Sequence, residues 1–384
     1  MKKVWKALSY VLVAVLASVA TMAVGAGNLE ESSKLDQLAD LIEERFIGEA
    51  DRTEMEDAAA EAMVESLGDR WSYYIPADEY QSRVEQMNNS YVGVGITIQV
   101  LEDGSGFEVT KVNEGGPAEE AGMLPGDIIV GVEGQSVLGM ESADVKNLVR
   151  GEEGTQVLLT VNREGEEISL SVTRKTVQTA VATGQMLEDN VGLVTIANFD
   201  SRCADETIAA IEELLEQGAE SLIFDVRFNP GGYKSELVKV LDYLLPEGPL
   251  FRSEDYKGEV IVDESDADCL EIPMAVLVNG DSYSAAEFFA AALSEYEAAV
   301  VVGEQTCGKG YFQTTIQLSD GSAVGLSVGK YSTPNGVSLA EVGGITPDIV
   351  VEVDEETAWG IYAQTLDPAE DPQIQAAVEA LKAE

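Results

Sequence analysis

The sequence predicts a multidomain α/β protein, and three observations support this fold class. The chain has 384 residues, which is enough for two or three domains with a sizeable core. Near the N-terminus the apolar residues recur at helical spacing, and from Tyr91 they alternate with small or polar residues, as in a half-buried strand. From Val191 onwards short apolar strands alternate with helical stretches, which is typical of a sheet covered by helices.

Composition restricts the partners of the chain. The net charge is −47, so binding to nucleic acid phosphates or to anionic membrane surfaces by charge is not expected. A salt-rich habitat and a merely acidic surface both fit this excess. The chain has no histidine and no paired-cysteine spacing, so no metal site is expected. Three cysteines are too few for a disulfide framework, although an oxidising compartment would allow Cys203 and Cys269 to pair.

The first 26 residues resemble a targeting segment. Lysines at positions 2, 3 and 6 precede an almost uncharged apolar run over residues 7–26. Small residues at its end offer a cleavage point, so a secretory signal peptide is the first interpretation. The run is nearly long enough to span a bilayer, and an uncleaved membrane anchor therefore stays open. Either interpretation places the body outside the cytoplasm, in the cell envelope or secreted.

Residues 28–90 are predicted to be a helical N-terminal region. Apolar residues recur at helical spacing between Leu35 and Phe46, and a second, alanine-rich stretch covers residues 55–67. Asn88 and Asn89 interrupt the pattern before its character changes.

Residues 91–176 are predicted to be a β-rich domain. Residues 116–129 resemble the central segment of a PDZ domain, and a short helix over 142–150 and a strand over 156–161 follow them. PDZ domains bind the C-terminus of a peptide as an added strand, while loop amides hold its carboxylate. Glycines let backbone N–H groups converge on an anion. The expected peptide-binding loop is Tyr91, Val92, Gly93, Val94, Gly95 and Ile96.

Residues 177–365 are predicted to form an α/β core, and its first notable turn joins a strand to a helix. The apolar strand 222–224 runs into Asp225-Val226-Arg227-Phe228-Asn229-Pro230-Gly231-Gly232, and a helix follows. Such a glycine turn can direct a backbone N–H into a site, although an ordinary strand-to-helix turn has the same residues.

A serine and a lysine stand out further along this core. Ser284 follows a predicted buried strand over 274–279 and opens a predicted helix over 284–296, while residues 298–302 form the next strand. At a helix start the hydroxyl is exposed and the helix dipole favours negative charge, although most serines there are only caps. Without histidine a Ser-His-Asp triad is impossible. A base for Ser284 would have to be a lysine with an accessible neutral form, such as Lys309.

The order of these segments resembles the C-terminal processing, or tail-specific, serine peptidases. The likeness covers nearly the whole chain after residue 28 and includes residues 67–74, 331–336 and 344–348. It implies Ser284 as nucleophile, Lys309 as general base and Gln313 as the residue that orients the lysine. It also implies an oxyanion hole from the backbone N–H groups of Gly232 and Ala285. The implied core is of the crotonase or Clp-protease type.

Competing residues and departures from the family pattern are few. Ser282 lies near Ser284, and Lys234 and Lys330 are other lysines, but none occupies the matching position. Tyr283, Ala286, Phe228 and Cys307 replace the usual residues, and none of these changes removes a catalytic group. Cys307 lies close to Lys309, which suggests redox sensitivity.

The predicted function is a serine endopeptidase with a Ser-Lys dyad and no cofactor, whose PDZ domain grips apolar C-termini of extracytoplasmic proteins. The alternative is a PDZ scaffold with an inactive core that binds peptides without cleaving them. A penicillin-recognising enzyme is disfavoured, because it would need lysine where Glu287 follows Ser284. The resemblance also suggests a homodimer through the terminal helical regions. Residues 366–384 are expected to be a linker and a final helix.

Overall fold

The computed structural model describes residues 33–382 apart from residues 102 and 114. The predicted targeting segment, residues 1–26, lies outside the described residues. The chain divides into two compact units, Met1–Pro76 and Ala77–Glu384, which are described in turn. In the described part of the chain no helix has the length and the apolar run needed to cross a membrane.

The first unit contains α2 (Lys34–Arg45), α3 (Arg52–Glu65) and the short strand β1 (Tyr73–Ile75). Ser33 begins α2 with a capping box, and the side chain of Asp51 accepts the first free N–H groups of α3. The two helical stretches predicted from the apolar spacing are therefore confirmed. Three leucines on α2 stay about half exposed: Leu35, Leu38 and Leu41.

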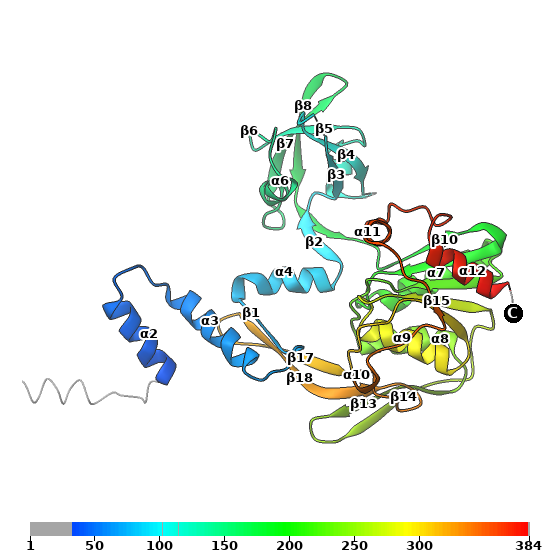
Figure 1. Cartoon of the computed structure of the whole chain (residues 1–384). Coiled ribbons are helices and arrows are strands. Elements are labelled where there is room, and N and C mark those ends of the chain that lie inside the picture. Colours follow the sequence, from blue (N-terminus) through cyan, green and yellow to red (C-terminus); the bar gives the residue numbers. More distant parts are fainter. Residues whose placement is uncertain (1–32, 102, 114, 383–384) are drawn as a thin grey trace, which may run out of the picture. The chain divides into compact units, whose positions relative to one another are not determined.

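The second unit begins with α4 (Ala77–Met87) and continues into a β-rich body (Figure 1). The strands β2 (Ser90–Gly93) and β9 (Lys175–Gln178) form an antiparallel pair. In the sequence β2 precedes this body and β9 follows it. Between them a sheet has the strand order β3-β4-β5-β7-β8, and β6 pairs with β5. The strands are β3 (Ile96–Val100), β4 (Phe107–Val112), β5 (Ile128–Val132), β6 (Gln135–Ser136), β7 (Gln156–Arg163) and β8 (Glu166–Thr173). The helices are α5 (Pro117–Glu120) and α6 (Ser142–Val149).

This β-rich body has a core of its own. Phe107, Ile129 and Leu159 are among its fully buried side chains, and the half-buried Ile96, Ile98 and Leu148 pack against this core. The buried Asp127 forms an ion pair with the partly exposed Arg163, 2.6 Å between Oδ1 and Nε. The β-rich body therefore has a hydrophobic core separate from those of the rest of the chain.

The remaining core of the chain is built on a six-stranded sheet of order β10-β11-β12-β15-β16-β19. The pairings from β11 onwards are parallel, and β10 is antiparallel to β11. The strands are β10 (Ala182–Met186), β11 (Val191–Ile196), β12 (Ser221–Asp225), β15 (Met274–Val278), β16 (Ala299–Gly303) and β19 (Ile349–Val350). The short helix η1 (Glu188–Asn190) precedes β11.

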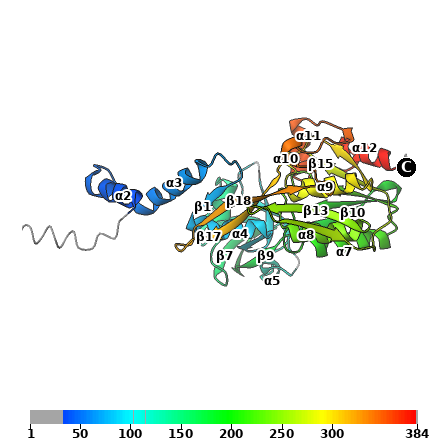
Figure 2. The ribbon, with the colours of Figure 1, turned by 90° about the horizontal axis from the view of Figure 1, so that it is seen from below.

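Helices cover both faces of this sheet, and the alternation of strand side chains explains why. Phe224 and Val276 point to one cluster with α7 (Cys203–Glu216), α8 (Lys234–Leu244) and α9 (Ala285–Glu295). Their neighbours Ile223 and Leu277 point to the other cluster, with α12 (Pro372–Leu381). Both faces are buried, so the strands are almost wholly apolar. Figure 2 shows α12 on one side of the sheet and α7 and α8 on the other.

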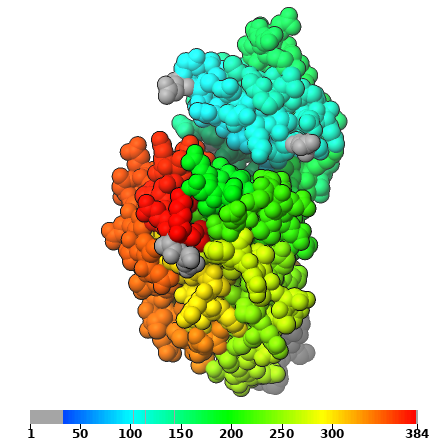
Figure 3. Space-filling model, turned by 90° about the vertical axis from the view of Figure 1, so that its right-hand side faces the viewer, coloured from blue at the N-terminus to red at the C-terminus, as the bar shows by residue number. Residues whose placement is uncertain are grey.

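A second sheet pairs β17 (Tyr311–Gln317), β18 (Ala323–Ser332), β13 (Gly248–Asp255) and β14 (Val260–Ser265) in antiparallel order. The C-terminal part of the chain adds α10 (Leu339–Val342) and α11 (Glu355–Tyr362) before α12. At the surface the red α12 lies beside green segments (Figure 3), and Lys382 pairs with Asp189 there at 2.6 Å. The expected final helix therefore packs on the sheet.

Candidate active site

Ser284 lies at a strained turn between β15 and α9. It is the N-cap residue of α9, with φ 60° and ψ −125°, a conformation that non-glycine residues rarely adopt. The expected strand, helix and following strand are present as β15, α9 and β16, in parallel register. The turn holds the serine at the N-terminus of a helix that is eleven residues long, where developing negative charge is stabilised.

Ser282, two residues earlier, has a structural role. Its side chain is fully buried, and its Oγ donates to the carbonyl of Val226 at 2.7 Å and accepts the N–H of Asn279 at 3.0 Å. These bonds hold the hydroxyl inside the turn. Of the two serines, Ser284 is therefore the better candidate for a nucleophile.

The glycine turn after β12 packs directly against Ser284. Gly231 has φ +87°, and a Cβ at this position would lie 2.7 Å from the Cβ of Ser284 and 2.9 Å from the nitrogen of Ala285. Gly232 has φ +151°, and its Cβ would lie 2.2 Å from the carbonyl oxygen of Phe199. The N–H of Phe199 donates to Gly231 at 2.8 Å. The turn predicted to supply an oxyanion hole therefore lies beside the predicted nucleophile.

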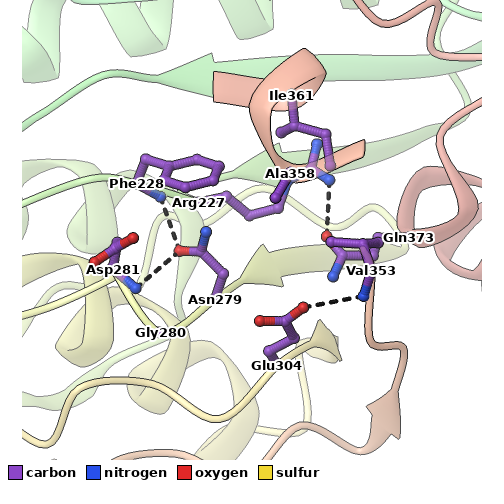
Figure 4. Close-up of a pocket in the computed structure, with 10 residues that line it drawn as sticks. All are labelled: Arg227, Phe228, Asn279, Gly280, Asp281, Glu304, Val353, Ala358, Ile361 and Gln373. Carbon is purple, nitrogen blue, oxygen red and sulfur yellow. Dashed lines mark hydrogen bonds between the residues drawn. The ribbon is translucent and has the colours of Figure 1, made fainter. Parts of the chain in front are cut away.

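Asn279 joins this glycine turn to the serine turn. Its Oδ1 accepts the N–H of Phe228 at 2.9 Å and the N–H of Asp281 at 3.2 Å (Figure 4). The N–H of Tyr283 also donates to the carbonyl of Asn229 at 3.1 Å. This role of Asn279 was not predicted, although an asparagine that ends a buried strand is a signal for such a turn.

Lys309 lies in the segment that connects β16 to β17. Its main-chain N–H donates to Oε2 of Glu287 at 2.9 Å, and its Nζ lies 5.8 Å from the centre of the Tyr283 ring. Burial raises the pKa of Tyr283, with Cys307 and Asp281 acting in the same direction against Arg83. The ring beside Lys309 is therefore a neutral phenol near neutral pH.

The two rival lysines each have an acidic partner. Lys234 Nζ lies 2.8 Å from Asp263, and Lys330 Nζ lies 3.1 Å from Glu254. Both lysines are held by these carboxylates, and neither lies between two glycines as Lys309 does.

Gln313 lies on β17, and its amide has partners other than those expected. The Nε2 donates to Oγ of Ser327 at 3.0 Å and to the carbonyl of Tyr311 at 3.3 Å. These bonds fix the amide on the sheet of β17 and β18. Orientation of Lys309 by Gln313 stays a prediction.

Arg227 anchors the glycine turn to the C-terminal helix, a role that was not predicted from the sequence. Its buried guanidinium lies 2.9 Å from Asp225 Oδ1, 2.8 Å from Asp371 Oδ2 and 2.8 Å from Gln373 Oε1. Burial works to lower the pKa of Arg227, but the two carboxylates raise it well above its ordinary value. Asp371 is the N-cap of α12, so the ion pair links that helix to the residue before Phe228.

A cavity of about 320 Å³ adjoins both turns at the carboxyl ends of β12, β15 and β16 (Figure 4). In open α/β sheets this edge is where ligands bind. Its walls combine acidic, apolar and amide side chains. The lining residues are Arg227, Phe228, Asn279, Gly280, Asp281, Glu304, Val353, Ala358, Ile361 and Gln373.

The predicted peptide-binding loop is only partly a loop. Tyr91, Val92 and Gly93 belong to β2 and pair with β9, and Ile96 begins β3. Val94 and Gly95 form the connection, in which Gly95 has φ +75° and the carbonyl of Val94 accepts the N–H of Ala118 at 2.9 Å. The loop predicted from the sequence was too long, because the residues of β2 belong to the same glycine-rich stretch as the Val94–Gly95 connection. Peptide binding by these residues stays a prediction.

The cysteines and acidic residues give no metal or disulfide site in the described part of the chain. No group of three or more histidine, cysteine, aspartate or glutamate side chains is arranged there to hold a metal ion. None of Cys203, Cys269 and Cys307 forms a disulfide. The pairing of Cys203 with Cys269 considered above is therefore not present in this structure.

Two family models match the chain. The model of peptidase family S41 matches residues 190–351, and the PDZ domain model matches residues 108–163. The first covers both glycine and serine turns and Lys309, and the second covers β4 through β7. The PDZ likeness seen in the sequence is confirmed.

Whole-chain comparisons agree with these matches. The carboxy-terminal processing protease CtpA of Bacillus subtilis strain 168 is 34% identical over 326 residues, which is 84% of this chain and 69% of that protein. A "Probable CtpA-like serine protease" of Staphylococcus aureus strain N315 is 30% identical over 337 residues, 87% of this chain and 67% of that protein. A crystal structure from Bacteroides fragilis NCTC 9343, which carries the S41 protease name, has a TM-score of 0.55 at 16% identity. It covers 90% of this chain and 97% of that one, and supports the fold alone.

Proposed function

Because the chain belongs to peptidase family S41 and is a serine peptidase with a PDZ domain, we propose that it cleaves extracytoplasmic proteins with a Ser284–Lys309 dyad after gripping their C-terminal tails. The observation that carries the dyad is geometric. Ser284 is held in a strained N-cap beside the glycine turn, while the carboxylate of Glu287 accepts the main-chain N–H groups of both Ser284 and Lys309. In a chain without histidine, lysine is the base that this site offers.

In the proposed reaction Oγ of Ser284 attacks the scissile carbonyl carbon and its proton passes to neutral Nζ of Lys309. The carbonyl oxygen gains negative charge and is stabilised by the N–H groups of Gly232 and Ala285. The C–N bond then breaks, and the leaving amine takes the proton from Lys309. Water attacks the resulting acyl-enzyme with Lys309 again as base, which releases the acid and regenerates Ser284. No cofactor enters these steps.

The PDZ domain is proposed to bind the substrate tail as an added strand. β3 lies at one end of its sheet and, in the described residues, pairs only with β4, so its other edge can accept a strand. Ile96 and Ile98 of β3 and Leu148 of α6 are half-buried apolar side chains that pack against the domain core, which favours apolar tail residues. The terminal carboxylate of the substrate would lie at the Val94–Gly95 connection, which precedes β3.

Location and assembly extend the proposal. Residues 1–26 have the charge and hydrophobic pattern of a signal peptide or membrane anchor, which supports an extracytoplasmic protein in the envelope or secreted. The half-exposed leucines of α2 support a homodimer through the N-terminal helices. Fractionation of cells that express the full chain, with protease accessibility of its C-terminus, tests the location. Light scattering tests the dimer.

The activity is tested with the full chain in mild detergent and unfolded model proteins that differ only in an apolar or a charged C-terminus. Wild type is expected to cleave the apolar-tailed substrate preferentially, with fragments identified by mass spectrometry. Ser284→Ala and Lys309→Ala should abolish cleavage, whereas Lys330→Ala, which removes a lysine paired with Glu254, should leave it intact. Full activity in Lys309→Ala would refute the dyad. Tail binding without cleavage under all conditions would favour the inactive scaffold.

A further inference from the structure

A single buried carboxylate contacts both halves of the proposed dyad. Glu287 lies in the first turn of α9 and is fully buried. Its Oε2 accepts the main-chain N–H groups of Ser284 at 3.0 Å and Lys309 at 2.9 Å. Its Oε1 accepts the N–H of Gly308 at 2.7 Å and the hydroxyl of Thr306 at 2.6 Å. Each carboxylate oxygen of Glu287 therefore accepts two hydrogen bonds.

Helix capping alone does not explain this arrangement. A capping box requires only that the third helical residue accept the N–H of the N-cap residue, here Ser284. The other three donors come from the segment that carries Lys309, which lies 19 to 22 residues further along the chain. Burying a carboxylate is costly unless its oxygens are fully hydrogen-bonded. Glu287 therefore joins two segments in addition to capping α9.

The segment with Lys309 is also held on its opposite side. The N–H of Thr306 donates to the carbonyl of Ile345 at 3.1 Å, and Thr306 Oγ1 accepts the N–H of Ile345 at 2.8 Å. A Cβ on Gly308 would lie 2.9 Å from the main chain of Gly343 and Gly344. The segment is therefore enclosed between Glu287 and residues 343–345. Small shifts along its length would break bonds on both sides.

We propose that Glu287 is the positioning residue that sets the main chain of Lys309 in register with Ser284. The inference rests on the proposed dyad mechanism. Glu287 does not contact the substrate; it acts by fixing where the Cα atoms of nucleophile and base lie. Misplacement of a reacting group by about 1 Å costs on the order of 100-fold in rate, so loss of this carboxylate should lower kcat much more than it changes KM.

Glu287→Gln is the most direct test because it keeps shape and volume. Its amide nitrogen would face at least one main-chain N–H donor in either orientation of the amide, so at least one of the four bonds is lost and a donor meets a donor. We expect kcat to fall about 100-fold with KM within about threefold. Thr306→Ser keeps the hydroxyl and should stay near wild type, while Thr306→Val should lower kcat about tenfold. Thr306→Val also serves if Glu287→Gln fails to fold.

Glu236→Gln is the matched control. Glu236 is likewise a buried glutamate in the first turn of a helix, but it accepts the N–H of Ala204 at 3.2 Å and pairs with Lys239. It touches neither Ser284 nor the segment with Lys309 in these bonds. The kcat of the Glu236→Gln variant should stay within about threefold of the wild-type value. An equal fall in both variants, in proportion to the folded fraction measured by circular dichroism, would overturn the proposal.

Amide hydrogen exchange gives a readout that does not require activity. In Glu287→Gln, peptides that contain Ser284 and peptides that contain Gly308 and Lys309 should exchange faster together, with the PDZ peptides unchanged. Unchanged exchange in both segments would overturn the positioning role, whatever the activity. If the wild type proves inactive while exchange responds as expected, the proposed function fails and the positioning role stands.

Discussion

A Cβ on Gly231 would lie 2.7 Å from the Cβ of Ser284, closer than two such atoms approach in proteins. The glycine turn and the serine turn therefore meet at a distance that only glycine permits. The φ of Gly231, +87°, imposes the same choice for a separate reason, because other residues rarely adopt it. Neighbouring Gly232 is equally restricted by Phe199. The contact explains why a candidate oxyanion donor can lie so near the nucleophile.

Gly231→Ala should therefore damage both activity and stability. The new methyl group must displace Ser284 or the carbonyl of Tyr283, which would lie 2.9 Å away. We expect kcat to fall at least 100-fold, and the free energy of unfolding to fall by about 2 to 3 kcal/mol from overpacking and strain. Peptide cleavage and urea unfolding measure the two effects.

Gly336→Ala is the control for this change. Gly336 also has a positive φ, +81°, but its Cβ would meet no atom within 4 Å. Only the conformational penalty applies, about 1 kcal/mol, and kcat should not change. Equal kinetic effects at the two glycines would show that the contact with Ser284 is unimportant.

The ion pair between Arg227 and Asp371 predicts that α12 supports the site from the far face of the sheet. Asp371→Ala removes a buried partner of Arg227 and also the cap that accepts the N–H groups of Gln373 and Ile374. Breaking a buried pair costs about 3 to 5 kcal/mol. We expect the free energy of unfolding to fall by that amount. We also expect a lower kcat, because Arg227 and the adjoining Phe228 belong to the glycine turn that packs against Ser284.

Asp354→Ala is the matched cap variant. Asp354 caps α11 through the N–H of Thr357 at 2.8 Å, is exposed, and pairs with no cation in the described part of the chain. Its loss should cost about 1 kcal/mol. If Asp371→Ala costs no more than Asp354→Ala in thermal unfolding, the link through Arg227 contributes nothing to the core.

Much of the fold could be predicted from the sequence because its signals are local. The period of the apolar residues identified the helices of the first unit, and β15, α9 and β16 occur where the pattern placed them. The membership of the antiparallel sheet of β17, β18, β13 and β14 was not predicted, because strand pairing across long separations leaves no periodic signal. The limits of the 91–96 loop were wrong for the same reason, since β2 is defined by its partner β9.

The residues of the candidate site were likewise predicted only in part. Ser284, Lys309 and Gly232 were found because their neighbours form recognisable motifs. Glu287 and Arg227 were not assigned roles, since an acidic or basic residue in such a sequence is usually solvated. Their burial reveals them. The Ser-x-x-Glu spacing of a capping box is a sequence signal that could have drawn attention to Glu287. Residues that act through main-chain donors leave little trace in a single sequence.

Gln313 provides a test that separates orientation of Lys309 from support of the sheet. If its amide orients the lysine, Gln313→Ala should lower kcat about tenfold or more, in the range of losses for general-base catalysis. Ser327→Ala removes the side chain to which Nε2 donates at 3.0 Å but keeps the amide, and should change kcat less than threefold. Peptide cleavage measures both. Equal losses in the two variants would assign Gln313 to sheet packing alone.

Cys203 predicts a loss of stability in mild alkali. Burial raises the pKa of this thiol to about 12, and the nearby charges of Asp200, Glu236 and Glu206 act in the same direction. In the unfolded chain the thiol ionises near pH 8.5. Above that pH the unfolded state loses a proton that the folded state keeps, so stability is present below about pH 8.5 and falls as the pH rises towards 12. By pH 9.5 the loss is about 1.4 kcal/mol.

Cys203→Ala should remove this pH dependence while leaving a constant cost from the lost Sγ, which lies 3.7 Å from Thr207 Oγ1. Urea unfolding at pH 7.5, 8.5 and 9.5 compares the slopes of the two proteins, and the difference between the slopes removes the contribution of tyrosines, which begin to ionise at the highest of these pH values. Iodoacetamide at pH 8.5 should modify half-buried Cys269 and Cys307 in the folded protein and reach Cys203 only on unfolding. Since both proteins share every other titrating group, identical slopes would mean that the Cys203 thiol ionises equally in the folded and unfolded states.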